Sequence, residues 1–290
     1  MTSEGGSAGE VLVGADGSGP SMRAVEWAAE EAAARGSTLT VWCVAVAGTA
    51  ANPMLWDGAE GVLVPAADVV RRGQERAAAA APGLAVTGGV GRGDPAQQLL
   101  ARAHGSDLLV VGERGLGAFL GLLVGSVSER VAAQAACPVV VVRGEPAPDL
   151  PVLVGVDGSA ANQAALGFAF AAAARRGVEL VALAAGEPHL ITPAIGSPAP
   201  VAADAEGARD AVRARLDDAL RPWTERHPDV AVRRVPVVGG ATRALVEASS
   251  HAGLAVVGSR GHGALAGTLF GSVSRHLLRQ AHGPVAVVRD

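Results

Sequence analysis

The sequence contains no tyrosine, and only 3% of its residues are aromatic and 18% charged. Hydrophobic residues nevertheless make up 49%, so we expect a core built from Ala, Val and Leu rather than from rings. The two cysteines, Cys43 and Cys137, lie in apolar segments and belong to no CxxC or Cys/His cluster. This pattern predicts two reduced core residues and argues against a redox or metal role.

Three further absences concern partners and location. No apolar run reaches the roughly 18 residues that a membrane-spanning helix needs. The first residues, MTSEGGSAGE, lack the basic and apolar regions of a secretory signal. The net charge of −4 is spread without a basic block, which argues against binding to nucleic acid or to an anionic membrane. We therefore expect a cytoplasmic protein with neither of these partners.

An internal repeat organises the chain, whose 290 residues suit two domains. VLVGADGS at residue 11 returns as VLVGVDGS at residue 152, a displacement of 141 (152 − 11). GSVSERVAAQAACPVVVVR at residue 125 returns as GSVSRHLLRQAHGPVAVVR at residue 271, a displacement of 146 (271 − 125). The second repeat therefore carries five additional residues (146 − 141), which we expect in a loop.

The repeat also predicts the domain bounds. The Pro-rich acidic stretch GEPAPDLP, residues 144–151, has the composition of a short linker. We predict a disordered tail at 1–9, a first domain at 10–143 and a second at 152–290.

Each repeat alternates apolar strands with Ala-rich helical segments. In the first repeat one helix ends at Gly36 as its C-cap, a second lies within 65–81, and a third starts after Asp94 as its N-cap. Five strands joined by helical connections predict an α/β fold with a mostly parallel sheet and helices on both faces. The stretches 48–61 and 186–207 show no clear period and are expected to be long loops, the longer one holding the extra residues.

A glycine element follows the fourth strand of each repeat, as GERGLGAFLGLLVGS from Gly112 and as GSRGHGALAGTLFGS from Gly258. The two copies share G-x-x-G, nine residues and G-S-V-S. Glycines that permit positive φ or close backbone approach, followed by a helix N-terminus, describe a phosphate cradle. The alternative is a strand end followed by a capping box of Ser126 with Glu129, although the second copy has Arg275 at the Glu129 position.

Two further residue types, an aspartate after the first strand and an arginine inside the glycine element, are candidates for the site. Asp16 and Asp157 end the first strand of each repeat, where a carboxylate can accept hydrogen bonds from adenine or ribose; the alternative is an Asp-Gly-Ser turn that caps a helix. Arg114 and Arg260 supply positive charge inside the loops or are simply solvated. No P-loop lysine, Ser/His/Asp constellation or metal-ligand spacing is present in the sequence.

Together, G-x-x-G-x9-G-[ST] after a strand, V-D-G-S near the start and P-V-x-V-V-R at the end resemble the universal stress protein family in its tandem form. The resemblance implies two Rossmann-like (adenine nucleotide alpha hydrolase-like) domains, each a five-stranded parallel sheet of order 3-2-1-4-5. It implies ATP as ligand, and Asp16 and Asp157 suggest indirect Mg²⁺ binding through water. Val44 and Ala184 are implied as backbone contacts to adenine. The predicted cofactor-binding residues are Asp16, Val44, Gly112, Arg114, Gly115, Gly125, Ser126 and Val127, then Asp157, Ala184, Gly258, Arg260, Gly261, Gly271, Ser272 and Val273.

The leading hypothesis is a cytoplasmic ATP-binding regulatory or stress-response protein with at most slow hydrolysis, because no water-activating base is evident. One alternative is a nucleotide-free interaction module, whose terminal strands 138–142 and 284–288 pair with each other as a pseudo-dimer or with another chain as a homodimer. The other is an enzyme of the ATP pyrophosphatase type, but GADGSGPS is not the expected S-G-G-x-D-S loop. Glu113, where the second repeat has Ser259, would weaken the first site if it faces the phosphates.

Overall fold

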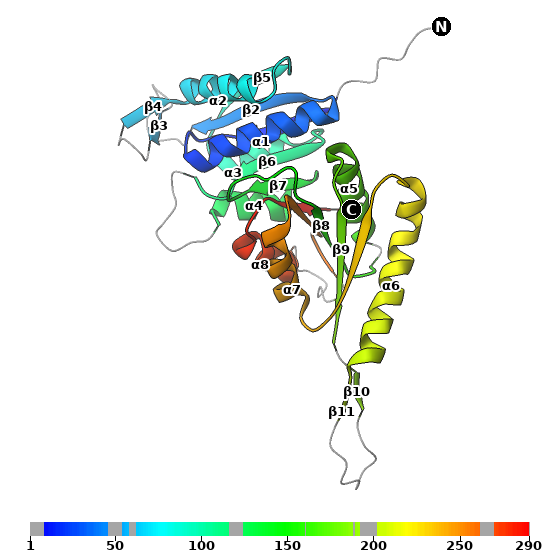
Figure 1. The fold of residues 1–290 in the computed structure, drawn as a ribbon. Coiled ribbons are helices and arrows are strands. Elements are labelled where there is room, and N and C mark those ends of the chain that lie inside the picture. The colour runs from blue at the N-terminus through cyan, green and yellow to red at the C-terminus, as the bar shows by residue number, and fades with distance from the viewer. Residues whose placement is uncertain are drawn as a thin grey trace. The chain divides into compact units, whose positions relative to one another are not determined.

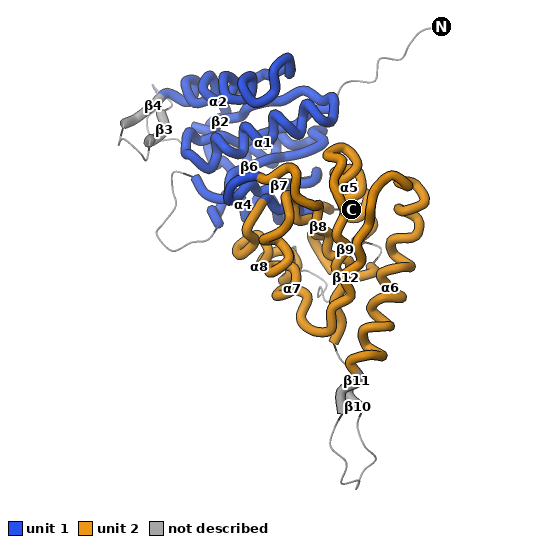
Figure 2. The backbone as a smooth tube through the Cα atoms, viewed as in Figure 1, with its two compact units in different colours: residues 1–146, 284–287 blue, residues 147–283, 288–290 orange. Residues whose placement is uncertain are grey.

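Two structural units divide the chain, one of residues 1–146 with 284–287 and one of residues 147–283 with 288–290 (Figure 2). The structure is a computed structural model. It describes residues 9–45, 54–57, 62–115, 124–159, 161–187, 189–191, 202–261 and 270–289. The predicted bounds of the domains and linker stay a prediction, and residues 1–8 of the predicted tail lie outside the described residues.

The first repeat is a parallel sheet in the order β5-β2-β1-β6-β7 (Figure 1). The predicted order 3-2-1-4-5 is therefore confirmed for this repeat. Its strands are β1 (Glu10–Gly14), β2 (Thr38–Ala45), β3 (Met54–Asp57), β4 (Val62–Pro65), β5 (Val86–Arg92), β6 (Leu108–Gly112) and β7 (Val139–Val142). Its helices are α1 (Gly19–Arg35), α2 (Ala66–Ala80), α3 (Pro95–Arg102) and α4 (Ser126–Gln134). Figure 1 shows α1 and α2 on one face of the sheet and α3 and α4 on the other.

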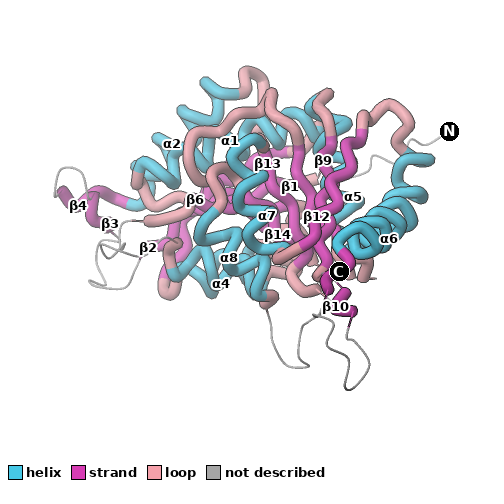
Figure 3. Tube along the Cα trace, turned by 60° about the horizontal axis from the view of Figure 1, so that its bottom comes forward, coloured by secondary structure: helices cyan, strands magenta, loops and turns pink. Residues whose placement is uncertain are grey.

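The second repeat has the equivalent strand order, β12-β9-β8-β13-β14. Its strands are β8 (Val152–Val156), β9 (Leu180–Gly186), β10 (His189–Ile191), β11 (Ala202–Asp204), β12 (Val232–Val238), β13 (Leu254–Gly258) and β14 (Val285–Val288). Its helices are α5 (Asn162–Arg176), α6 (Ala205–Arg226), α7 (Ala241–Ala248), the short 3₁₀ helix η1 (Ser249–His251) and α8 (Ser272–Gln280). Helices α7 and α8 pack side by side over the strands (Figure 3).

The central strands are buried on both faces, which explains why they are continuously apolar. Val11, Leu12 and Val13 of β1 have no exposed surface, and every residue of β6 is buried. Cys43 and Cys137 are buried free thiols, as predicted. Burial, with a smaller contribution from Asp16, raises the pKa of Cys43 to about 12, so this thiol stays protonated.

Helix ends in the first repeat follow the predicted chemistry. Gly36 adopts φ 65° at the end of α1, and its N–H bonds to Ala32 and Ala33 carbonyls. The Asp94 carboxylate accepts a hydrogen bond of 2.7 Å from the N–H of Gln97 at the start of α3. Both predicted caps are therefore confirmed.

The stretches predicted as long loops contain short strands. β3 pairs antiparallel with β4 from Met54 opposite Pro65 to Asp57 opposite Val62. β10 and β11 form the corresponding pair in the second repeat, with His189 opposite Asp204. Strands of three or four residues are too short to show an alternating pattern, which is why the sequence indicated loops.

The position predicted for the five extra residues is wrong. The connection before the second-repeat helix is shorter, 18 residues (187–204) against 20 (46–65) in the first repeat. The following helix is longer, since α6 has 22 residues where α2 has 15. Seven residues gained in the helix and two lost from the connection give the net five.

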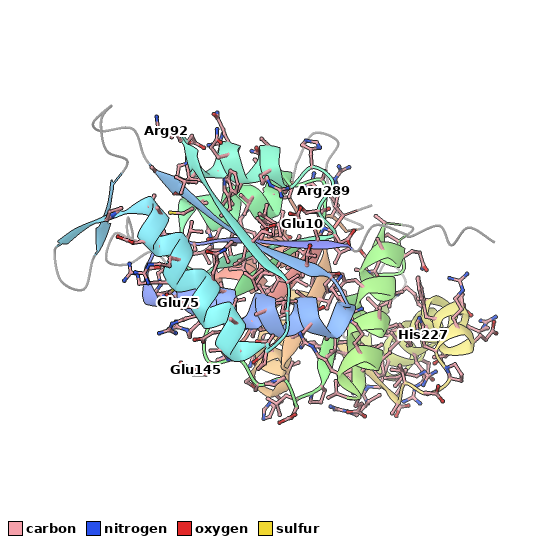
Figure 4. All side chains as sticks on the ribbon, turned by 90° about the horizontal axis from the view of Figure 1, so that it is seen from above. Glu10, Glu75, Arg92, Glu145, His227 and Arg289 are labelled. Carbon is pink, nitrogen blue, oxygen red and sulfur yellow. The ribbon has the colours of Figure 1, made fainter. Side chains whose placement is uncertain are left out.

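Helix α6 continues past Pro222, whose ring would normally end a helix. Trp223 stacks on Phe170 of α5 at 6.2 Å between ring centroids and on His227 at 6.4 Å. Its indole N–H donates a hydrogen bond of 2.9 Å to Gln163. Figure 4 labels His227 at the end of this helix. These contacts hold the last turn of α6 against α5.

Among the described residues, no helix is both long enough and apolar enough to cross a membrane.

Candidate nucleotide site

The glycine element of the first repeat joins the end of β6 to the start of α4. Gly112 is the last residue of β6, and the N–H of Glu113 donates to the Val142 carbonyl at 2.9 Å. The chain then returns, so that the N–H of Gly125 donates to the carbonyl of Glu113 at 2.8 Å. This bond closes the loop at its base and places the N-terminus of α4 beside the strand end. Residues 116–123 and the equivalent 262–269 lie outside the described residues.

The two serines of G-S-V-S, Ser126 and Ser128, have different environments and different hydrogen bonds. Gly125, not Ser126, is the N-cap residue of α4, and it provides no side-chain capping bond. Ser126 is exposed, whereas Ser128 is buried and donates a hydrogen bond of 2.7 Å to the Gly112 carbonyl. The capping-box alternative is therefore wrong, because Ser126 lies inside the helix. Ser128 was not predicted as a functional residue, although the second serine shared by the two repeats was a signal for it.

The second repeat reproduces this arrangement. Gly271 is the N-cap residue of α8, and its N–H donates to the Ser259 carbonyl at 2.9 Å. Ser272 is exposed, and the buried Ser274 donates to the Gly258 carbonyl at 2.6 Å. An exposed hydroxyl at a helix N-terminus is therefore present in both repeats, next to unpaired helix N–H groups.

The loop glycines are required by close approach rather than by positive φ. Neither Gly112 nor Gly115 has positive φ, contrary to one of the two reasons predicted for them. A Cβ on Gly112 would lie 2.8 Å from the Pro20 carbonyl carbon, and one on Gly115 would lie 2.2 Å from Oδ2 of Asp16. A Cβ on Gly261 would likewise lie 2.7 Å from Oδ2 of Asp157. The aspartate carboxylate that follows the first strand therefore lies against the second loop glycine in both repeats.

Both explanations offered for the strand-one aspartates are compatible with the structure. Oδ1 of Asp16 accepts hydrogen bonds from the N–H and the hydroxyl of Ser18 at 3.0 and 2.6 Å, which forms the predicted turn. Ser159 makes the same two bonds to Asp157, at 2.8 and 2.7 Å. These bonds fix each carboxylate, while its other oxygen faces the glycine loop.

A cavity of about 490 Å³ lies in the second repeat, where these parts meet. This volume is within the range of about 300–1,000 Å³ that is typical of small-molecule sites. The predicted residues that line it are Asp157, Gly258, Arg260, Gly261, Gly271, Ser272 and Val273. The structure therefore brings most of the second predicted set to one cavity, at the carboxyl ends of β8 and β13.

The strand pairing shows which residue of the second repeat is equivalent to Val44, the predicted adenine contact of the first. Gly14 pairs with Trp42, and Gly155 pairs with Leu183, so Val44 is equivalent to Ala185 and not to Ala184. Ala185 and Leu183 line the cavity, whereas Ala184 is not among its lining residues. Ala185 is therefore the strand equivalent of Val44 that lines the cavity, and the backbone contact to adenine stays a prediction.

Asn162 is a further cavity residue, which was not among the predicted site residues. It begins α5, is only 3% exposed and lines the cavity. Its Nδ2 donates a hydrogen bond of 2.9 Å to the Gly155 carbonyl, which fixes the orientation of the amide because a carbonyl can only accept. Its Oδ1 is buried with no hydrogen-bond partner. A buried unpaired acceptor costs about 1–3 kcal/mol, so a donor from a bound molecule would stabilise it.

The loop arginines differ between the repeats. Arg114 is exposed, and its Nη2 lies 3.8 Å from Oε1 of the buried Glu113. Arg260 is exposed and lines the cavity. In the described part of the chain, no three His, Cys, Asp or Glu side chains come together as a metal site. Indirect Mg²⁺ binding at the two aspartates stays a prediction.

Comparison with known proteins gives consistent matches over the chain. The model of the universal stress protein family matches residues 9–143 and 150–289. A universal stress protein of Mycobacterium tuberculosis strain H37Rv is 37% identical over 293 residues, covering 97% of each chain. One from Mycolicibacterium smegmatis is 37% identical over 289 residues, covering 96% of each chain. The crystal structure of a universal stress protein from Archaeoglobus fulgidus aligns with a TM-score of 0.68 at 20% identity, covering 97% of this chain and 98% of its own.

Proposed function

The chain belongs to the universal stress protein family, and from that premise we propose that each repeat binds an adenine nucleotide, ATP above all. The phosphates bind the loop and helix N-terminus at Gly258–Gly261 and Gly271–Ser272, and at the equivalent residues of the first repeat. The base lies toward the end of the second strand, at Val44 and Ala185. Nucleotide occupancy then changes the surface of a cytoplasmic protein that regulates a stress response.

The observation that carries the proposal is the cavity of about 490 Å³. Its walls combine backbone N–H groups at the start of α8, the hydroxyl of Ser272 and the carboxylate of Asp157. The first two suit phosphate oxygens, because a helix N-terminus presents unpaired donors and favours negative charge. The carboxylate suits a donor, such as a ribose hydroxyl or an adenine amino group.

The residues that line the cavity favour nucleotide binding over rapid nucleotide hydrolysis. Among the described residues that line the cavity, Asp157 is the only carboxylate, and Ser159 already donates two hydrogen bonds to its Oδ1. A general base for water needs a group of suitable pKa within hydrogen-bond reach of that water. Magnesium, if bound with the phosphates, would neutralise part of their charge. We therefore expect at most slow hydrolysis.

The first experiment is the nucleotide content of the purified chain. Nucleotide is released with acid and resolved by chromatography, and the emptied protein is then dialysed against ATP, ADP, AMP, cAMP and GTP. We expect adenine nucleotide, and a preference for adenine over guanine of at least about tenfold. An empty protein that binds none of these at millimolar concentration would overturn the proposal and leave the interaction module as the working hypothesis.

Asn162→Ser provides a test of the cavity itself, because Ser21 is the equivalent residue of the first repeat. The Ser21 hydroxyl donates to the Ser18 carbonyl at 3.0 Å and accepts from the Asp16 N–H at 3.3 Å. We expect ATP affinity at the second repeat to fall roughly tenfold, since a hydrogen bond to a buried acceptor contributes about 1–1.5 kcal/mol. The measurement is calorimetric titration of chains in which the first site is blocked by Gly115→Val.

The control is the unfolding midpoint of the ligand-free Asn162→Ser chain, which should remain close to that of the parent. The variant loses the bond to Gly155 but also loses an unpaired acceptor. An unchanged ATP affinity would show that the Asn162 amide faces buried water rather than the nucleotide.

A further inference from the structure

The second repeat carries a buried amide where the first repeat carries a hydroxyl. Asn162, at the start of α5, lies five residues after Asp157 (162 − 157), as Ser21 of α1 lies five residues after Asp16 (21 − 16). The two side chains belong to residues that are only 3% and 4% exposed, so both are shielded from bulk solvent. Their hydrogen bonds inside the protein therefore decide what each repeat can bind at this position.

The hydroxyl of the first repeat is satisfied locally, whereas the amide of the second repeat is not. Ser21 donates to the Ser18 carbonyl at 3.0 Å and accepts from the N–H of Asp16 at 3.3 Å. Nδ2 of Asn162 donates to the Gly155 carbonyl at 2.9 Å, but its Oδ1 has no hydrogen-bond partner in the part of the chain that the structure describes. The bond to Gly155 also keeps the amide from turning over, because a carbonyl cannot donate. An oriented acceptor therefore lines the cavity.

This acceptor lies beside the glycine element. Asn162 bonds to β8, which lies between β9 and β13 in the sheet. A Cβ on Gly258, the first loop glycine at the end of β13, would lie 3.9 Å from the carbonyl oxygen of Ala161. In the first repeat a Cβ on Gly112 would lie 2.9 Å from the backbone nitrogen of Ser21. The start of this helix is therefore close to the proposed phosphate loop in both repeats.

An unpaired acceptor at this place limits which group of a nucleotide it can bind. Phosphate oxygens and the ring nitrogens of adenine are themselves acceptors, so they cannot pair with Oδ1 of Asn162. The donors of an adenine nucleotide are its 6-amino group and its 2′ and 3′ hydroxyls. The amino group is at the end of the base that is farthest from the phosphates, whereas both hydroxyls belong to the sugar that carries the phosphates. An acceptor close to the phosphate loop is therefore placed for the ribose.

We infer that Asn162 accepts a hydrogen bond from a ribose hydroxyl, so that the second repeat selects ribonucleotides over deoxyribonucleotides more strongly than the first repeat does. This inference rests on the proposed function. Asp16 and Asp157 place a carboxylate against the second loop glycine of each repeat, so any contact that they make to the sugar is common to both. A deoxyribose that lacks the paired hydroxyl leaves Oδ1 of Asn162 buried without a partner, and a site of this kind rejects such a ligand.

The test compares ATP with 2′-deoxy-ATP and 3′-deoxy-ATP by calorimetric titration of the full chain. Gly115→Val chains report the second repeat, and Gly261→Val chains report the first. At the second repeat we expect one of the two deoxy compounds to bind at least about tenfold more weakly than ATP, and at the first repeat the same compound should bind within about threefold of ATP. Equal affinities for all compounds at the second repeat, or the same loss at both repeats, would overturn the inference and leave the proposed function intact. No binding of any of them would overturn both.

Asn162→Ser shows whether the amide itself selects the sugar. We expect the variant to lose roughly tenfold in ATP affinity but to bind the disfavoured deoxy compound within about twofold of the parent, because that compound has no hydroxyl to lose. Equal weakening of ATP and both deoxy compounds would indicate a general effect on the cavity and contradict the inference. The comparison of ATP with its deoxy forms on the parent residue needs no change at Asn162, so it decides the question even if the variant unfolds.

Inosine triphosphate separates the sugar from the base, since it has a carbonyl in place of the adenine amino group and keeps both hydroxyls. We expect Asn162→Ser to weaken its binding by the same factor as that of ATP. An effect of the substitution that disappears with this compound would assign the amide to the adenine amino group and overturn the inference.

Discussion

Purified Gly115→Val protein is expected to lose nucleotide from the first repeat, with affinity there falling roughly 100-fold or more. A Cβ at this position would lie 2.2 Å from Oδ2 of Asp16. The carboxylate cannot turn away without losing its two hydrogen bonds from Ser18. The loop must therefore shift, and a shift that removes two or three hydrogen bonds to phosphate, each contributing about 1 kcal/mol, accounts for that loss.

The second repeat supplies the matched control. Gly261→Val places a Cβ 2.7 Å from Oδ2 of Asp157 and should remove nucleotide from that repeat alone. Each single variant is therefore expected to keep one site, and the double variant none, when bound nucleotide is counted per chain by equilibrium dialysis. Urea unfolding of every variant checks the fold. Full retention of nucleotide by a folded double variant would show that the loop does not hold the phosphates.

Ser128→Ala and Ser126→Ala are expected to separate stability from binding, although only one residue lies between them. Ser128 is 5% exposed and donates to the Gly112 carbonyl, so its loss leaves a buried acceptor and should lower the free energy of unfolding by about 1–3 kcal/mol. Ser126 is exposed and is not the N-cap residue, so its loss should change stability by less than about 0.5 kcal/mol.

For ATP affinity we expect the reverse, with Ser126→Ala having the larger effect and Ser128→Ala the smaller. Ser126→Ala removes a donor to phosphate and should weaken ATP binding roughly five- to tenfold at the first repeat. Ser274→Ala and Ser272→Ala repeat the pair in the second repeat, where Ser274 donates to Gly258 at 2.6 Å. Denaturation curves and titrations of all four variants are the measurement. If Ser126→Ala destabilised the fold as much as Ser128→Ala, the assignment of separate roles would be wrong.

The alternation of strands and helices and the helix caps could be predicted from the sequence because both depend on local or repeated signals, whereas the strand order was implied by the resemblance to the family. Apolar runs such as that of β6 are buried along their whole length, and Asp94 and Gly36 act within one turn of a helix end. The two segments that occur in both repeats, at residues 11 and 152 and at residues 125 and 271, then identified the equivalent elements, including the glycine element.

Other features could not be predicted, because they depend on contacts between distant residues. Ser126 and Glu129 matched a capping box, but the helix begins one residue earlier, with Gly125 as its N-cap. Asn162 has no sequence signal as a cavity residue, since its role follows from a bond to Gly155 and from burial by the surrounding walls. The longer α6 was missed because its first residues follow a Pro- and Gly-rich stretch and its end lies beyond Pro222.

The stacking of Trp223 on Phe170 gives the second repeat an optical signal of its own. The chain has four tryptophans and no tyrosine, and the other three, Trp27, Trp42 and Trp56, all lie in the first repeat. Emission from Trp223 therefore originates on α6, the helix that also carries Arg215 at the cavity wall. In a chain that retains only this tryptophan, fluorescence therefore reports on the second repeat without an added dye. The signal depends on the stacking of Trp223 on Phe170 and on its hydrogen bond to Gln163.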